Sequence, residues 1–290
     1  MTKTIKSLQK KIAEKLSPIS KEEASLESKI ILSYILGIKE NELFLFGKKK
    51  LSILQKIKLN IFLKKRLRGI PLYKIIGRKE FYNSEFITTK NVLDPRSETE
   101  ILVDDIVSKN DKKKPLSILE FGVGSGCIML SLLKHFKNAK GLGFDISKKA
   151  VKIANKNSNL LKVSDRFLLK NKSWNYLSDK DFDKDQKFDL IISNPPYIKS
   201  GDVKDLQLEV KKYDPMFALD GGNDGLNCYR DIAKVIKDLD LLSDSTGKIY
   251  LEIGGGQESD IEEIFSNNGF KLEETIKDFS DIIRILIFSK

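Results

Sequence analysis

The tetrapeptide Asn194-Pro195-Pro196-Tyr197 combines residue types that can hold a planar amino group. Consecutive prolines fix φ and donate no hydrogen bond, so they form a stiff wall with free carbonyl groups. The Asn194 side-chain oxygen and the Pro195 carbonyl can each accept one hydrogen of an –NH2 group, and Tyr197 offers a flat face for stacking. Such an amino group would direct its nitrogen lone pair at an electrophile without a separate base. The alternative interpretation is a proline-stiffened turn.

A glycine-rich motif precedes it in the chain, directly after an apolar segment that predicts a strand over residues 117–121. The motif comprises Gly122, Val123, Gly124, Ser125 and Gly126. Asp145 ends the next expected strand, about 20 residues on, where an acid can accept hydrogen bonds from ribose hydroxyls. The G-x-G-x-G spacing favours a nucleoside without a pyrophosphate, such as S-adenosylmethionine, over NAD. The alternatives are a tight strand–helix turn and a helix-capping role for Asp145.

Two aromatic residues allow two interpretations each. Trp174 follows an expected strand over residues 166–169 and could be a core residue or a shelf for a cofactor. Phe81 could line a substrate channel or pack a hairpin. The residues themselves do not decide between these roles.

The elements that position these motifs fall into three regions. Residues 1–75 have helical periodicity and predict a small all-helical domain. Residues 76–95 contain aromatic and β-branched residues around Asn83-Ser84, typical of a β-hairpin linker.

From residue 96 to 290, expected strands and helices alternate, which predicts an α/β domain with a parallel sheet covered on both faces. Two final apolar runs, 270–275 and 282–288, predict an antiparallel pair that brings the sheet to seven strands. The other expected strands are residues 117–121, 139–145, 166–169, 188–193 and 248–253.

Composition excludes several classes of function. The chain has a single histidine, His135, and two cysteines, Cys127 and Cys228, which argues against a metal site and a histidine-based triad. The 52 Lys and Arg residues exceed the 41 Asp and Glu residues by 11, but only seven of them are Arg. Because specific nucleic-acid readers rely on Arg, we attribute the lysine excess to compositional drift and expect no direct nucleic-acid partner. No apolar run reaches 18 residues, so we expect no membrane contact and a cytoplasmic location.

With these motifs in place, the chain resembles the release-factor N5-glutamine methyltransferases (PrmC/HemK type). The resemblance extends from Arg68-Gly69-Ile70-Pro71-Leu72 to Leu251-Glu252-Ile253-Gly254 and includes the two motifs above. Further matching segments are Val92-Leu93-Asp94-Pro95-Arg96, Glu98-Thr99-Glu100, Tyr213-Asp214-Pro215 and Gly221-Gly222-Asn223-Asp224-Gly225-Leu226.

The resemblance implies a seven-stranded Rossmann-like class I methyltransferase domain at residues 96–290 and a substrate-recognition role for the helical domain. It implies S-adenosylmethionine contact at the 122–126 loop, Asp145, Trp174 and Asn194. It also implies catalysis by Asn194, Pro195 and Tyr197, with substrate contact along 194–197, including Pro196. The implied substrate is the glutamine of the Gly-Gly-Gln motif in peptide chain release factors.

Three other functions are compatible with these motifs. A nucleic-acid methyltransferase could present adenine or cytosine amino groups to the same tetrapeptide, but we expect no target-reading domain after the sheet. A relative that methylates a ribosomal-protein glutamine is nearer, although the Pro95-Arg96-Ser97-Glu98-Thr99-Glu100 stretch looks more like the release-factor type. A cofactor-binding module without catalysis would not need an intact 194–197 motif.

Overall fold

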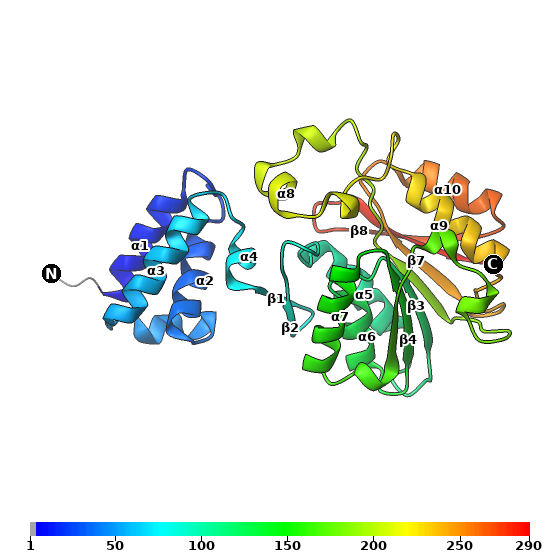
Figure 1. The fold of residues 1–290 in the computed structure, drawn as a ribbon, viewed down its shortest axis with the longest axis horizontal. Coiled ribbons are helices and arrows are strands. Elements are labelled where there is room, and N and C mark those ends of the chain that lie inside the picture. Colours follow the sequence, from blue (N-terminus) through cyan, green and yellow to red (C-terminus); the bar gives the residue numbers. More distant parts are fainter. Residues whose placement is uncertain (1–3) are drawn as a thin grey trace. The chain divides into compact units, whose positions relative to one another are not determined.

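The computed structural model describes residues 4–290, which divide into two compact units, one ending at Gly77 and the other spanning Arg78–Lys290 (Figure 1). The first unit is helical. Its elements are α1 (Ile5–Leu16), α2 (Ala24–Leu36), the 3-10 helix η1 (Glu40–Phe46), α3 (Ile53–Arg66) and α4 (Leu72–Ile76). Inside it, the buried Arg66 guanidinium donates two hydrogen bonds of 2.8 Å to the Glu27 carboxylate, so the buried charge is paired.

The second unit begins with an antiparallel hairpin, β1 (Arg78–Phe81) and β2 (Ser84–Ile87). Tyr82 and Asn83 form its turn with positive φ, as a two-residue hairpin requires. The Phe81 ring is 1% exposed and lies edge-on to Phe86 with centroids 6.0 Å apart. Phe81 therefore packs the hairpin, and the division into units groups this hairpin with the sheet that follows.

A seven-stranded sheet forms the centre of the second unit, in the order β5-β4-β3-β6-β7-β9-β8. The first five strands in sequence are parallel, and β9 runs antiparallel to both β7 and β8. Their bounds are β3 (Ser117–Phe121), β4 (Lys140–Asp145), β5 (Phe167–Asn171), β6 (Leu190–Ser193), β7 (Lys248–Glu252), β8 (Lys271–Lys277) and β9 (Ile283–Ser289). The predicted fold class is confirmed, and the structure adds that β9 lies between β7 and β8.

Helices cover both faces of this sheet (Figure 1). Alternate residues of one strand enter different cores, since Ile118 packs with α5 (Ser97–Lys109), α6 (Cys127–His135) and α7 (Lys148–Leu160). Leu119 instead packs in the core that contains α9 (Asn227–Asp238) and α10 (Glu258–Asn267). The remaining short elements are η2 (Ser164–Arg166), η3 (Trp174–Tyr176), η4 (Asp179–Asp181), η5 (Val203–Asp205), α8 (Leu208–Tyr213) and η6 (Met216–Ala218).

Candidate active site

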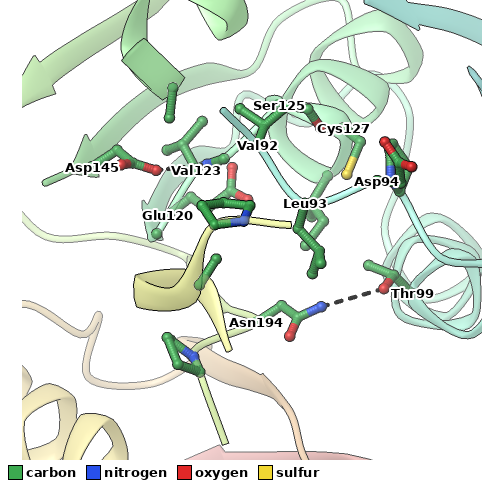
Figure 2. A pocket seen from close by; sticks show the side chains of 18 of the residues that line it. Val92, Leu93, Asp94, Thr99, Glu120, Val123, Ser125, Cys127, Asp145 and Asn194 are labelled. Atoms are coloured by element: carbon green, nitrogen blue, oxygen red, sulfur yellow. Dashed lines mark hydrogen bonds between the residues drawn. The ribbon is translucent and has the colours of Figure 1, made fainter. Parts of the chain in front are cut away.

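Two neighbouring cavities open at the carboxyl ends of the parallel strands, and Asn194 lines both of them. The first, drawn in Figure 2, is lined by the whole 122–126 loop except Gly126, and by Asp145, Trp174 and Pro196. The second is lined by Pro195 and Tyr197, together with apolar and charged residues that include Leu206, Val210, Glu252 and Arg284. The segment 194–197 therefore contributes to both cavities, which also share Leu93, Arg96 and Ala218. Ligands of doubly wound sheets bind at this edge.

The glycine-rich loop turns sharply between β3 and α6. Gly122, Gly124 and Gly126 have φ of 76°, 57° and 84°, in the left-handed region where a side chain is strained. A Cβ on Gly126 would also lie 2.8 Å from the Leu130 side chain, so this glycine allows α6 to pack closely against the sheet. The loop consequently presents backbone, rather than side chains, to the first cavity.

Asp145 ends β4, and its buried carboxylate holds two backbone segments together. One oxygen accepts from the Gly124 N–H at 2.8 Å and the other from the Ser147 N–H at 2.7 Å. The cap of α7 is Ser147, whose hydroxyl accepts from the Ala150 N–H, so Asp145 does not itself cap that helix. Burial raises the pKa of Asp145, while the two backbone hydrogen bonds oppose that rise. Each carboxylate oxygen keeps a further lone pair for a ligand hydroxyl.

Trp174 lies partly in the core and partly in the wall of the first cavity. Its ring lies edge-on to Phe121, with centroids 6.4 Å apart, and packs against the core under α9. The same ring lines the first cavity, and one of its carbons would lie 3.6 Å from a Cβ placed on Gly122. The indole is therefore anchored in the core while forming part of the cavity wall.

Glu120, the last residue but one of β3, is the strongest sign that the first cavity receives a polar ligand. Its side chain lines the cavity (Figure 2) and is 1% exposed, yet its Oε2 has no hydrogen-bond partner among residues 4–290. Burial raises the pKa of this carboxyl well above its usual range. An unpaired buried oxygen is costly, and the amino group of a methionine moiety would satisfy it. The residues present thus fit S-adenosylmethionine.

Side-chain hydrogen bonds to backbone carbonyls hold the chain at both ends of the 194–197 segment. The Ser193 hydroxyl donates to the Phe121 carbonyl at 2.9 Å, which joins the ends of β6 and β3. Gln257 donates from Nε2 to the Tyr197 carbonyl at 3.1 Å and accepts from the Gly254 N–H at 3.0 Å. The position of the tetrapeptide is consequently fixed by groups outside the cavities.

Two glycines of the 221–226 segment allow this close packing. A Cβ on Gly221 would lie 2.7 Å from the Pro196 carbonyl oxygen, and one on Gly225 would lie 2.5 Å from that of Tyr197. Ile198 also forms a parallel bridge with Asp220, which aligns the two segments. No side chain fits between them.

Thr99 and Glu252 were not predicted as site residues. The Thr99 hydroxyl, from the first turn of α5, donates to Glu252 Oε2 at 2.6 Å, and Asn194 Nδ2 donates to the Thr99 oxygen at 3.3 Å (Figure 2). Glu252 ends β7 and is 4% exposed. Burial raises its pKa to about 7, whereas hydrogen bonds from Thr99 and Asn194 oppose the rise. The signal that identifies these residues is a buried acid, Glu252, linked through the Thr99 hydroxyl to the cavity-lining amide of Asn194. This signal exists only in the folded structure, because the sequence does not show that the three residues are close together.

Comparison with known proteins identifies the family. Over 274 residues the chain is 35% identical to the release factor glutamine methyltransferase of Caulobacter vibrioides, and the match covers 94% of this chain and 92% of that protein. The chain belongs to the release factor glutamine methyltransferase family. Matches to the PrmC N-terminal domain at residues 7–77 and to the methyltransferase small domain at residues 81–210 agree with this membership.

Some relatives are longer than this chain. The chain is 35% identical to the bifunctional methyltransferase of Rickettsia felis over all of its own length, but it spans only 58% of that protein. Among solved structures, a ribosomal protein L11 methylase from Lactobacillus delbrueckii subsp. bulgaricus is 21% identical, with a TM-score of 0.45, over 68% of this chain and 80% of that one.

Two further observations concern residues 4–290 of this methyltransferase family member. The helices between residues 4 and 290 all fall short of the length and apolar character that a membrane span requires. Within the described residues, His, Cys, Asp and Glu side chains form no group of three that could hold a metal ion.

Proposed function

We propose that this chain transfers a methyl group from S-adenosylmethionine to the side-chain amide nitrogen (N5) of the glutamine in the Gly-Gly-Gln motif of peptide chain release factors. Family membership supports the reaction class and the substrate. Such a substrate implies a cytoplasmic location. The single observation that carries the proposal is the position of segment 194–197 along two neighbouring cavities, with Asn194 lining both.

The first cavity would hold the cofactor through backbone and buried carboxylates. Asp145 would accept from the ribose hydroxyls, Glu120 from the amino group, and the 122–126 loop would lie under the methionine portion. Trp174 would contribute a flat apolar surface. When bound, S-adenosylmethionine supplies a methyl carbon on a positively charged sulfur, which departs with the bonding electron pair.

The tetrapeptide would bind and orient the substrate amide. Asn194 Oδ1 and the Pro195 carbonyl accept one N–H each, and Tyr197 stacks on the amide plane from the second cavity. Holding both N–H bonds turns the nitrogen lone pair towards the first cavity and stabilises positive charge that develops on nitrogen. As the new carbon–nitrogen bond forms, one of the two N–H protons is released to water, which restores a neutral amide.

Methylation of purified proteins with isotopically labelled S-adenosylmethionine tests this function. We expect label in a release factor, none after its Gly-Gly-Gln glutamine is replaced by Asn, and none in DNA. Label in a ribosomal protein or in DNA, with none in the release factor, would replace the proposal by one of the two alternative functions.

We further propose that the helical unit recognises the protein substrate. Its α3 presents an unusually apolar exposed surface, with Ile57 and Ile61 more than half exposed on one side of the helix. Exposed apolar patches of this kind typically mark protein interaction sites.

The double variant Ile57→Ser, Ile61→Ser tests this role of the helical unit. We expect KM for the release factor to rise about 30-fold while the Kd for S-adenosylmethionine stays unchanged, since the two side chains together contribute roughly 2 kcal/mol of apolar burial. Leu168→Ser, at an exposed apolar residue of edge strand β5, is the matched control. Equal KM values for the double variant and this control would reject the role.

A further inference from the structure

Three side chains from three separate elements form one hydrogen-bonded chain that reaches segment 194–197. Glu252 comes from the end of β7, Thr99 from the first turn of α5, and Asn194 from the residue after β6. The oxygen of Thr99 lies 2.6 Å from Glu252 Oε2 and 3.3 Å from Asn194 Nδ2. Thr99 and Glu252 are both almost fully buried, although Thr99 lines the first cavity and Glu252 the second.

The direction of this chain follows from the chemistry of its first member. An ionised carboxylate only accepts hydrogen bonds, so the single hydroxyl proton of Thr99 is committed to Glu252. The Thr99 oxygen can then only accept, and Asn194 must turn its NH2 group towards it. Figure 2 shows this orientation, with the nitrogen of Asn194 facing Thr99 and its oxygen facing away.

We propose that Thr99 is a positioning residue, which transmits the ionised state of Glu252 to Asn194 and thereby keeps the Asn194 oxygen directed at the substrate amide. The inference rests on the proposed function. Thr99 also lines the first cavity, but in this scheme it acts on the substrate amide only through Asn194. Without this constraint the Asn194 side-chain amide can rotate by half a turn. Its NH2 group would then face the N–H group of the substrate, which needs an acceptor.

Protonation of Glu252 would reverse the chain. A protonated carboxyl can donate to Thr99, whose hydroxyl can then donate to the oxygen of Asn194, and the amide rotates. Because burial raises the pKa of Glu252 to about 7, this reversal falls within an accessible range of pH. The scheme therefore predicts that methyl transfer weakens as pH falls through about 7.

Other charged and titratable groups surround Glu252. Glu98 on α5 raises its pKa, and Arg284 on β9 lowers it. Arg96, before α5, lines the same cavity as Glu252. Further neighbours are Tyr197 after β6, Cys127 on α6, and Tyr229 on α9, whose hydroxyl donates to the Glu252 backbone carbonyl at 2.8 Å. Burial raises the pKa of all three of these groups above their usual values, so none of them changes charge near neutrality.

The test compares Thr99→Val, which removes the hydroxyl and keeps the shape, with Thr99→Ser, which keeps the hydroxyl. Single-turnover methyl transfer to a release factor is measured between about pH 6 and 8.5 with saturating S-adenosylmethionine, so that weaker cofactor binding does not enter the rate. Glu252→Gln is a second variant that leaves Thr99 in place. His135→Gln controls for the sole histidine, which lies at the end of α6.

We expect wild type, Thr99→Ser and His135→Gln to share one acidic limb near pH 7 and to differ in rate by less than about threefold. Removing a group that orients another typically costs about 10–100-fold, so Thr99→Val and Glu252→Gln should fall by that factor above pH 7.5 and lose the limb. Their Kd values for the release factor should change by less than about threefold, because only the reacting amide is affected.

Three results would overturn the inference. They are a Thr99→Val rate equal to wild type, a slow Thr99→Val that keeps the acidic limb, and a Glu252→Gln variant with wild-type rate and limb. Thermal melting and cofactor Kd establish that each variant is folded, and Glu252→Gln decides the matter if Thr99→Val is not. A wild-type enzyme that labels no release factor would instead refute the proposed function, and this inference with it.

Discussion

Replacing Asn194 by Ala removes one of the two acceptors that the proposed mechanism gives to the substrate amide. The Pro195 carbonyl remains, so one of the two N–H bonds is still held. Removing a single preorganised group of this kind costs about 10²–10³ in rate, equivalent to about 3–4 kcal/mol of transition-state stabilisation.

The structure argues that this loss would not come from unfolding. The hydrogen bond from Asn194 to Thr99 is long, at 3.3 Å, and Thr99 keeps its 2.6 Å bond to Glu252 when Asn194 is truncated. The buried Glu252 carboxylate loses the hydrogen bond from Asn194 but keeps the one from Thr99, and the Asn194 side chain lines cavities rather than a packed core. We therefore expect a cost in stability of at most about 1 kcal/mol.

Single-turnover methyl transfer to a release factor, with saturating cofactor, measures the effect of Asn194→Ala. Affinity for the release factor should change by less than about threefold, because contacts remote from the reacting nitrogen hold most of the substrate. Asn138→Ala is the matched control, since it removes an exposed Asn side chain that donates to the Lys113 carbonyl far from the cavities. An Asn194→Ala rate within threefold of that control would refute the amide-orienting mechanism.

Three other perturbations have defined outcomes. Asp145→Ala should weaken binding of S-adenosylmethionine about 5- to 150-fold, or 1–3 kcal/mol, by calorimetry, and an unchanged Kd would reject its ribose role. Gly225→Ala combines φ of 80° with a Cβ 2.5 Å from the Tyr197 carbonyl oxygen, so both the melting temperature and the turnover should fall; retention of both would contradict the close packing. For Glu252→Gln, denaturant titrations at several pH values should show the variant gaining stability relative to wild type as pH rises from about 4.5 to 7. In that window the folded carboxyl with its raised pKa holds a proton that the unfolded one has released, and the limit is about 3 kcal/mol. If the difference in unfolding free energy between variant and wild type stayed constant across pH, the pKa of the Glu252 carboxyl would not be raised in the folded protein.

The elements were predictable from sequence because their apolar patterns are local. The segments predicted as strands over 117–121 and 248–253 correspond to β3 and β7 within a residue, since each is a short, largely apolar run bounded by turn residues. The insertion of β9 between β7 and β8 was not predicted, because the chain order of the last two runs does not say which of them pairs with β7. The sequence predicted that the last two strands form an antiparallel pair, but it did not predict which of them lies next to β7.

Part of the candidate site was predictable from the sequence and part was not. The residues predicted from the 122–126 loop and the 194–197 tetrapeptide come together at one edge, because motifs at the ends of neighbouring parallel strands must meet there. Their individual roles stay predictions. Thr99 and Glu252 are 153 residues apart, and an ordinary Thr in a helical turn gives no sign of a buried carboxyl beside it. Asp145 was open to a capping interpretation because spacing does not show that Ser147 fulfils it.

The packing of Gly221 and Gly225 against the tetrapeptide has a consequence for how this protein tolerates mutation. Neither residue offers a functional group, and Gly221 lines neither of the two cavities that Asn194 shares. Yet any side chain there would push the Pro196 or Tyr197 carbonyl and move the acceptors of the neighbouring residues with it. A saturation scan scored by methyl transfer should therefore place both glycines among the least tolerant positions, alongside Asn194. From that scan alone, Gly221 and Gly225 would be mistaken for catalytic residues, although their role is to leave room for the tetrapeptide.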